Sequence, residues 1–494
     1  MKNKKNNKAI VVGAGIGGIA TALWLRKKGY KVTVLEASAE PGGKLSQFTK
    51  AGFRFDMGPS LFTLPQFVDE LFALFGENAS ENFRYRKLDV ICKYMYEDGT
   101  CINAFQDVNK FAEEIEKKAG VKKSTTLKYL QKSAQLYHLT AEVFIFRSFH
   151  KLSTFLSKKF IRSLLRWYKL DVFSTMHKVN EKTFGDSRIV RLFDRYATYN
   201  GSNPYSAPAT LNVIPHLEHN LGAYFPEKGM YDIIEQLYQL AVRQGILFEF
   251  STPVQEILIK NRKVKGVKVN GFTRKAHILI SNADVVPTYR LMNTTPLPEK
   301  YLRQERSTSA LIFYWGVNKQ FPGLDLHNIL FSEDYEGEFH SLFKTHTVFD
   351  DPTVYIFISS RKVTKDAPQG CENWFTMINV PANTGQDWDA LIKAARANII
   401  SKINRMLKTD IERYIKLEEC QDPRIIEQRT SSYQGSLYGT SSNNRFAAFR
   451  RHPNFSKIKN LFFVGGSVHP GGGIPLCLSS AKITEGFISS QNKN

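Results

Sequence analysis

Cysteine is scarce in this chain of 494 residues, and its five positions follow no regular spacing. The number is odd, and no pair shows the Cys-x-x-Cys spacing that many zinc and redox sites use. A disulfide scaffold and a cysteine-based zinc site are therefore both disfavoured, and we expect free thiols in a reducing compartment. The five residues are Cys92, Cys101, Cys371, Cys420 and Cys477.

Long apolar segments are also missing. A membrane-spanning helix needs about 20 mostly apolar residues. Segment 461–481 lacks Lys, Arg, Asp and Glu, but its five glycines and two prolines are typical of loops. The basic start MKNKKNNK leads directly into a short glycine-bearing stretch, without the apolar region and cleavage site of a secretory signal. We therefore expect a cytoplasmic protein without a spanning helix.

Positive charge and aromatic side chains are, in contrast, abundant. Lys and Arg number 68 against 46 Asp and Glu, which gives a formal net charge of +22. Such a surplus favours anionic partners, whether nucleic acid, phosphate-bearing ligands or anionic lipid. No zinc-finger, helix-turn-helix or RNA-binding signature accompanies the charge, so nucleic acid is disfavoured. Aromatic residues make up 13% of the chain, and part of this apolar area could contact something other than protein.

A glycine-rich turn near the N-terminus predicts a dinucleotide-binding unit. Gly13, Gly15 and Gly18 form the pattern G-x-G-x-x-G between an apolar strand and a helix, within a strand–turn–helix–strand unit over 8–36. The glycines permit a tight turn, a close approach of pyrophosphate and close packing of helix on strand. The helix N-terminus offers free N–H groups to phosphate. Glu36 ends the second strand and can accept hydrogen bonds from ribose hydroxyls, which disfavours NADP.

Further motifs follow in a fixed order along the chain. PGGK over 41–44 and FDMGPS over 55–60 come first, a TPV strand begins at Thr252, and SNAD over 281–284 ends another strand. A second glycine loop, VGGSVHPGGGIP over 464–475, leads into the last predicted helix. This order resembles the carotenoid desaturases, the bacterial phytoene desaturase-like branch of the flavin amine-oxidase superfamily. HPGGGIP over 469–475 and YATYNGSNP over 196–204 are the most specific marks.

The resemblance implies FAD as the cofactor and assigns residues to it. The glycine turn would hold the pyrophosphate, Glu36 the adenosine ribose, and Val254 the adenine through its backbone. Lys44 would lie near the diphosphate or ribose, and Ser467 stands where many flavoproteins place an acid for the ribityl chain. The implied set is Gly13, Gly15, Gly18, Glu36, Lys44, Ser60, Leu61, Val254, Asn282, Asp284, Gly466, Gly473 and Ile474.

The implied fold is α/β, with a Rossmann-like FAD-binding domain, an inserted substrate domain and a helical, membrane-facing region. The FAD-binding domain would comprise residues 1–75, 229–290 and 426–494. The substrate domain would comprise 76–125, 191–228 and 291–425, and residues 126–190 would form the basic helical region. Oligomeric state does not follow from the sequence.

Segment 143–170 combines large apolar side chains with cations. On a helix, the cations gather in an arc separate from the apolar residues, which suits a helix at an anionic membrane surface. An ordinary amphipathic helix packed on the core is the alternative. Because carotenoids reside in the bilayer, the resemblance favours peripheral docking at the inner face of the membrane. The apolar set is Ile145, Phe149, Leu152, Leu156, Phe160 and Trp167, and the cations are Lys151, Lys158, Arg162, Arg166 and Lys169.

No nucleophile motif or metal-ligand cluster is present, and we assign no catalytic residue and no metal. His216, Glu218 and His219 suggest a loop near substrate or an ordinary surface pair rather than a metal site. A flavin desaturase needs mainly orientation of a C–H bond and an apolar tunnel, because the cofactor performs the hard step. Residues 196–225 and the run 313–315, Phe-Tyr-Trp, are the candidate lining, with ordinary core as the alternative.

The pattern of residues 43–45 and 58–63 resembles the hydroxycarotenoid 3,4-desaturase branch more than phytoene desaturases, which more often have GGRA at the first site. The implied reaction is 3,4-desaturation near the end of a hydroxylated acyclic or monocyclic carotenoid, by hydride transfer to flavin. Repeated desaturation of C40 phytoene is one alternative. A flavin amine oxidase-like enzyme is another, from a different class.

Overall fold

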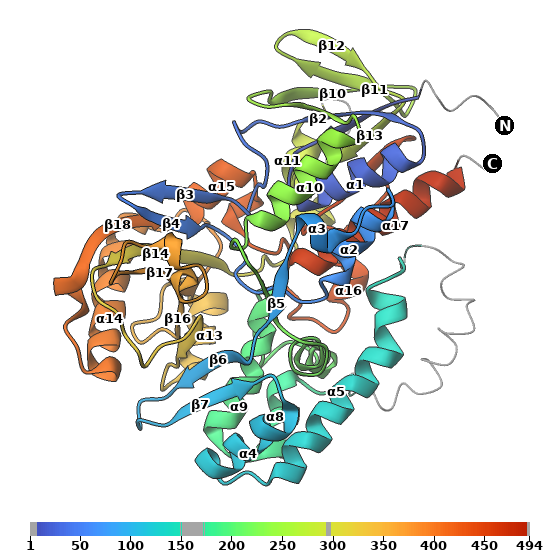
Figure 1. Cartoon of the computed structure of the whole chain (residues 1–494). Helices are drawn as coiled ribbons and strands as arrows, with labels where there is room; N and C mark the ends of the chain where they lie inside the picture. The colour runs from blue at the N-terminus through green and yellow to red at the C-terminus, as the bar shows by residue number, and fades with distance from the viewer. Residues whose placement is uncertain (1–6, 149, 151–170, 172, 293–297, 492–494) are drawn as a thin grey trace.

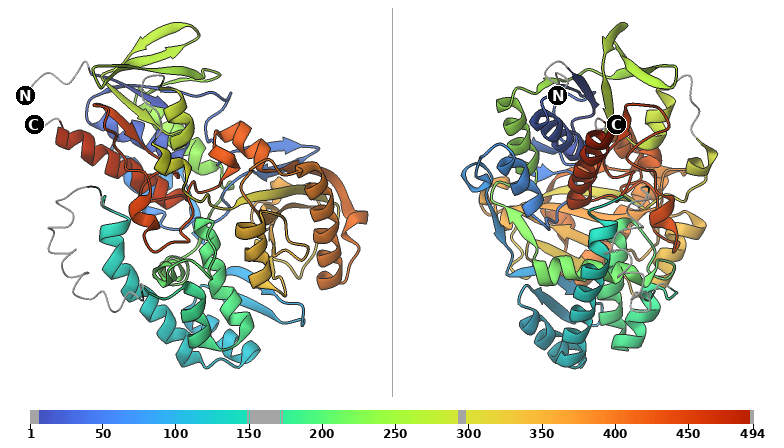
Figure 2. Two further views of the ribbon diagram at one scale, coloured as in Figure 1. Left: turned by 180° about the vertical axis from the view of Figure 1, so that it is seen from behind. Right: turned by 90° about the vertical axis from the view of Figure 1, so that its right-hand side faces the viewer.

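A computed structural model describes residues 7–148, 150, 171, 173–292 and 298–491 (Figure 1). A five-stranded parallel sheet and a seven-stranded mixed sheet organise these residues, and a third, three-stranded sheet lies beyond the parallel one. Figures 1 and 2 show the parallel sheet with its helices in one half of the molecule. The seven-stranded sheet and a helical region form the other half.

The parallel sheet has the strand order β19-β13-β1-β2-β9. The strands are β1 (Lys8–Val12), β2 (Lys31–Leu35), β9 (Leu247–Glu249), β13 (Ile278–Ser281) and β19 (Leu461–Phe463). β1, β2, β13 and β19 are short and mostly buried, as expected for a parallel sheet covered on both faces, whereas the edge strand β9 has no buried residue. α1 (Ile16–Lys27) packs against α17 (Ile474–Gln491) and α10 (Asp232–Arg243). The predicted strand–turn–helix–strand unit over 8–36 is confirmed.

Two different sheets share the segment over 272–281. β12 (Phe272–Lys275) pairs with β11 (Lys263–Val269) in the three-stranded sheet, and its residues are exposed. β13 then begins at Ile278, beside β1 in the parallel sheet, and is fully buried. Asn261 and Arg262 form the turn that joins β10 (Val254–Lys260) to β11, and both have positive φ.

The seven-stranded sheet has the order β18-β14-β17-β16-β15-β6-β7. β14 (Ser309–Val317) is buried along its whole length, between β17 (Glu372–Val380) and β18 (Ile415–Gln421). Its odd-numbered residues join a core beneath α14 (Trp388–Leu407), whereas Ala310, Ile312 and Tyr314 belong to the main core. The other strands are β16 (Val354–Phe357), β15 (His327–Leu330), β6 (Val90–Met95) and β7 (Cys101–Phe105).

Helices make up the end of the molecule farthest from the parallel sheet (Figure 1). They are α4 (Val108–Ala119), α5 (Lys123–Phe144), α8 (Met176–Phe184) and α9 (Ser187–Asp194), followed by short turns at Arg195–Asn200, Ala209–Val213 and His216–Leu221. Most of the predicted docking segment 143–170 lies outside the described residues. Among the described helices, none has the length and apolar character needed to cross a bilayer.

Asp56, in the FDMGPS motif, connects β4 (Phe53–Asp56) to the segment that precedes α10. It ends β4, which pairs with β3 (Gln47–Lys50), and accepts hydrogen bonds from the backbone N–H groups of Met230 and Tyr231 at 3.0 and 2.9 Å. These donors precede α10. Arg54 bonds Asp56 at 2.7 Å and Asp366 at 3.0 Å. Asp56 therefore accepts hydrogen bonds from free N–H groups at the N-terminus of α10, a helix that packs on α1.

The remaining elements are short and connect these layers. They are α2 (Gln66–Ala73), α3 (Ala79–Asn82), β5 (Tyr85–Lys87), β8 (Tyr224–Pro226), α11 (Val285–Arg290), α12 (Glu299–Leu302), α13 (Tyr335–His340), α15 (Pro423–Thr430) and α16 (Ala447–Arg450).

Candidate functional site

A cavity of about 1100 Å³ extends from the carboxyl ends of the parallel strands to the seven-stranded sheet. Pockets for a single small ligand usually measure about 300–1,000 Å³, so this cavity has room for a large cofactor and part of a second molecule. Every residue assigned to the cofactor by sequence lines it, except Gly18. These residues come from six separated stretches of sequence, which the fold brings together around the cavity.

The glycine turn leaves no space for side chains at its base. A Cβ atom on Gly18 would overlap the carbonyl oxygen of Gly13, and one on Gly15 would lie 2.6 Å from Asn282 Nδ2. Gly13 has a φ of 97°, which favours glycine. Gly18 thus lies behind the cavity wall, where it lets α1 approach the strand. The bare backbone at the N-terminus of α1 fits a pyrophosphate group.

Glu36 stands at the end of β2, is buried, and lines the cavity. Its two carboxylate oxygens accept hydrogen bonds from the backbone N–H groups of Ala14 at 2.6 Å and Ser38 at 2.9 Å. A carboxylate has lone pairs for further donors. The two backbone donors therefore orient Glu36 beside the glycine turn and leave it able to accept a bond from a ribose hydroxyl.

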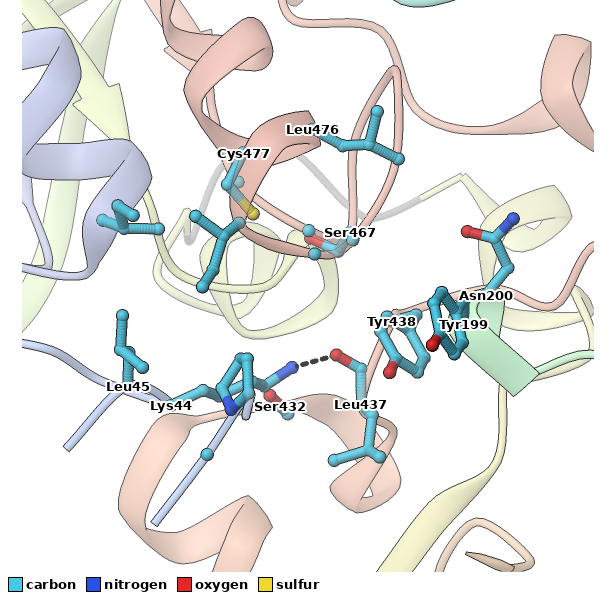
Figure 3. Close-up of a pocket in the computed structure, with 18 of the residues that line it drawn as sticks. Lys44, Leu45, Tyr199, Asn200, Ser432, Leu437, Tyr438, Ser467, Leu476 and Cys477 are labelled. Atoms are coloured by element: carbon cyan, nitrogen blue, oxygen red, sulfur yellow. Dashed lines mark hydrogen bonds between the residues drawn. The ribbon is translucent and has the colours of Figure 1, made fainter. Parts of the chain in front are cut away.

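Lys44 and Asp284 both line the cavity, and the charge of each shifts the pKa of the other. Lys44 Nζ donates to the carbonyl oxygen of Leu437 at 2.6 Å (Figure 3), and to that of Ser436 at 3.2 Å. Burial lowers the pKa of Lys44, and the negative charge of Asp284 opposes this shift. Burial raises the pKa of Asp284, opposed by Arg306 and Lys44. Lys44 thus links the segment after β2 to the loop over 436–437 at the cavity wall.

The second glycine loop forms the cavity wall at the N-terminus of α17. Gly466, Gly473 and Ile474 line the cavity here, and Ser467 Oγ accepts a bond from the N–H of Val285 at 3.3 Å. A Cβ atom on Gly472 would lie 2.6 Å from Tyr438, which packs directly on the loop. Free N–H groups at this second helix N-terminus suit an electron-rich ring edge.

Apolar side chains dominate the part of the cavity beyond the glycine loops. Residues of the stretch 196–225 line it, as predicted. The run 313–315, the other candidate lining, does not line the cavity, so that prediction is wrong. Phe313 and Trp315 point into the core beneath α14, and Tyr314 packs on Phe48 and Phe55. Ala310 and Ile312, earlier on the same strand, reach the cavity instead. Other apolar lining residues are Leu61, Leu64, Ile91, Leu217, Ile329 and Leu437.

Buried polar side chains also line this wall, and most of them were not predicted from the sequence. Arg195, His327 and Tyr355 line the cavity together with Glu218, which occupies a buried helical turn rather than a surface. Arg195 immediately precedes the motif YATYNGSNP over 196–204. The signal in the sequence is an arginine with Phe193, Tyr196 and Tyr199 within four residues of it.

Comparisons with known proteins agree with this architecture. The model of the flavin containing amine oxidoreductase family matches residues 16–484. A 1-hydroxycarotenoid 3,4-desaturase of Flavobacterium sp. (strain P99-3) is 50% identical over 487 residues, covering 98% of this chain and 99% of the relative. A phytoene desaturase of Fusarium fujikuroi is 31% identical over 502 residues, covering 96% of this chain and 88% of the relative.

This chain is a carotenoid desaturase family member of the flavin-containing amine oxidoreductases. It is therefore an oxidoreductase, and its cofactor is FAD. An oxidoreductase from Methanosarcina mazei shares the fold, with a TM-score of 0.63 at 14% identity over 98% of this chain and 100% of the other. The expected α/β fold of the flavin amine-oxidase superfamily is confirmed.

Proposed function

We propose that this desaturase introduces the 3,4 double bond near the end of a hydroxylated carotenoid. The observation that carries the proposal is the cavity itself, which runs without interruption from the glycine cradle to an apolar wall. The relative that is 50% identical over nearly the full length is named for 1-hydroxycarotenoid 3,4-desaturation. The substrate would be acyclic or monocyclic.

The FAD assignments made from the sequence suit the arrangement of the cavity. Gly13 and Gly15 would hold the pyrophosphate, Glu36 the adenosine ribose, and Val254 the adenine. Gly18 would act by packing. The residues from Ser60 to the start of α17 would line the flavin half: Ser60, Leu61, Asn282, Asp284, Gly466, Gly473 and Ile474, with Lys44 opposite. When bound, FAD supplies the acceptor for two electrons and a hydrogen from carbon.

The chain's own contribution is orientation and exclusion of water. The apolar wall would hold the polyene against the flavin half, and the cation left by loss of hydride would be delocalised along the polyene. Loss of a proton from the neighbouring carbon completes the double bond, so the demand on any one side chain is low. No catalytic acid or base is assigned.

The domain division follows the same arrangement. We propose residues 1–75, 229–290 and 426–494 as the FAD-binding domain, because they contain all strands of the parallel sheet. Residues 76–125, 191–228 and 291–425 would form the substrate domain, which contains the seven-stranded sheet. Residues 126–190 would be the membrane-docking region.

Peripheral binding to an anionic membrane surface, at the inner face and in the cytoplasm, completes the proposal. Besides segment 143–170, the described surface at α16 supports it. The side chains of Phe446 and Phe449 are 48% and 45% exposed, and the Arg445 guanidinium lies 5.1 Å from the Phe446 ring. Arg445 and Phe449 also line the cavity. Aromatic side chains beside cations at a cavity mouth suit entry of a lipid-soluble substrate.

Identification of the pigment made in living cells tests the reaction. We expect cells that accumulate a 1-hydroxycarotenoid to convert it, once they express this chain, into a product with a longer conjugated chain. Conversion of phytoene with no effect on the hydroxycarotenoid would identify a phytoene desaturase instead. Unchanged pigments in both hosts, with the protein present and yellow, would contradict carotenoid desaturation.

A further inference from the structure

A buried cluster of polar side chains interrupts the apolar wall of the cavity. Arg195 donates to the hydroxyl oxygens of Tyr94 at 2.5 Å and Tyr199 at 3.0 Å. Glu218 accepts from the hydroxyls of Tyr199 at 2.5 Å and Tyr196 at 2.8 Å. The Arg195 and Glu218 side chains are 9% and 1% exposed. Burial of an arginine and a carboxylate costs free energy, so this placement in the wall calls for an explanation.

A second polar group lies beside this cluster on β15 and β16. Tyr355 exchanges hydrogen bonds of 2.7 Å with both Ser60 Oγ and His327 Nδ1. Burial lowers the pKa of His327 to about 3, which keeps the ring neutral. Within the described residues, His327 Nε2 and Arg195 Nε are buried without a hydrogen-bond partner. Both side chains line the cavity, so these two nitrogen atoms remain available for hydrogen bonds to a ligand.

The cluster also lies close to the predicted flavin half. In Figure 3, Tyr199 and Asn200 lie beside Tyr438, with Ser467 of the glycine loop nearby. A Cβ atom on Gly201 would lie 2.9 Å from the Tyr438 ring, and one on Gly472 would lie 2.6 Å from the same residue. One tyrosine ring therefore separates the polar cluster from the loop that begins α17.

We propose that Arg195, Tyr199 and Glu218 form a specificity subsite that binds the terminal hydroxyl group of the carotenoid. The inference rests on the function proposed above. A hydroxyl on C1 is joined to C3 through two carbon–carbon bonds of about 1.5 Å each. A hydrogen bond to that hydroxyl therefore places the 3,4 bond a few ångströms from the subsite, next to the flavin half.

Contacts of the apolar chain alone cannot fix the position of the 3,4 bond along the cavity. The repeating units of the chain carry no polar group, and contact with an apolar wall is non-directional. A hydrogen bond between the subsite and the terminal hydroxyl would fix that position. The polar groups of the subsite would also disfavour a chain end without a hydroxyl, since such an end excludes water and leaves buried donors and acceptors unpaired. Tyr199 bridges both charged residues and is the side chain that a hydroxyl would join most directly.

Paired ligands test this subsite. The substrate pair is a 1-hydroxycarotenoid and the same skeleton without its hydroxyl, and the binding pair is the two corresponding 3,4-desaturated products, which cannot react again. The variants are Tyr199→Phe and Glu218→Gln in the FAD-loaded protein, with Tyr129→Phe as the matched control. Tyr129 is also buried, and its hydroxyl bonds Asn180 at 3.0 Å outside the cavity.

We expect Tyr199→Phe and Glu218→Gln to weaken binding of the hydroxylated product, and to lower kcat/KM for the hydroxylated substrate, by about 10–100-fold. Both values for the deoxy pair should change less than about threefold, and Tyr129→Phe should alter neither. Equal losses for both pairs, or no loss in variants that retain FAD, would overturn the subsite. Failure of the wild-type protein to desaturate either substrate would instead contradict the proposed function.

Discussion

Single residues at the glycine turn have distinct roles. Gly13 and Gly15 face the cavity, whereas Gly18 sits behind its wall, where a methyl group would overlap the Gly13 carbonyl oxygen. A contact of this kind with backbone cannot be relieved by rotation of a side chain. Loss of Gly18 should therefore disturb the turn and the start of α1 together.

We expect Gly18→Ala to destabilise the protein by about 2 kcal/mol or more, as other overpacked sites do, and to reduce its FAD content. Thermal unfolding and flavin absorbance per protein measure the two effects. Gly486→Ala is the matched control, because this helical glycine has open space around it and an ordinary φ. The control should be neutral or stabilise α17 by roughly 0.5–1 kcal/mol. Equal behaviour of the two variants would contradict the packing role of Gly18.

The short helix α13 carries a buried carboxyl group, Glu338, whose titration should be measurable. Glu338 in α13 is buried and accepts hydrogen bonds from the Thr353 backbone N–H at 3.1 Å and its hydroxyl at 2.6 Å. Burial raises the pKa of Glu338 from 4.5 to about 7, which the bonds from Thr353 and the charge of Lys402 oppose. Between these two pH values the native protein therefore holds a proton that the unfolded chain has lost.

The stability contributed by this proton is complete below pH 4.5 and is lost as the pH rises to about 7. Glu338→Gln keeps the shape and cannot titrate; its amide oxygen accepts from the Thr353 N–H, and its NH2 group donates to the Thr353 hydroxyl oxygen in place of accepting from it. We expect the variant to gain stability relative to the wild type as the pH increases from 4.5 to 8, by an amount on the order of 3 kcal/mol. Denaturant unfolding across this range measures the difference, and a constant difference would contradict the shift.

The elements also show how far sequence reasoning reaches. The unit over 8–36 was predictable because its apolar strands, glycine turn and terminal Glu36 are local in sequence. The lining residues of β14 were not, because a strand buried on both faces shows no alternation between polar and apolar residues. Which face meets the cavity depends on α14, a distant element. The Asp56 cap on α10 and the contacts of Arg195 likewise form only when separated segments meet.

At the scale of the whole molecule, the positive charge and the cavity mouth both bear on how a lipid-soluble substrate enters the cavity. Under the proposed function, a lipid-soluble substrate would pass from a bilayer to the proposed flavin half without crossing water. The net charge of +22 attracts an anionic surface. Exposed aromatic side chains at α16 and the cationic segment 143–170 both suit the place where such a surface would bind.

Charge reversal in that segment tests membrane docking. We expect the quadruple variant Lys158→Glu, Lys159→Glu, Arg162→Glu and Arg166→Glu to lose flotation with anionic vesicles, because each cation near the surface contributes about 1 kcal/mol. The control reverses the same number of charges in the three-stranded sheet, at the exposed residues Lys260, Lys263, Lys265 and Lys268. The control should still float. Equal loss in both variants would attribute binding to net charge rather than to this segment.

The central claim is hydride removal from a hydroxylated carotenoid in a cavity shared with FAD. The most direct measurement supplies purified, FAD-loaded protein and an electron acceptor with a 1-hydroxycarotenoid in liposomes, followed by mass spectrometry and absorption spectroscopy of the pigment. The account predicts a product that lacks two hydrogens at C3 and C4 and absorbs at longer wavelength. An unchanged hydroxycarotenoid, beside phytoene that the same preparation desaturates, would contradict it.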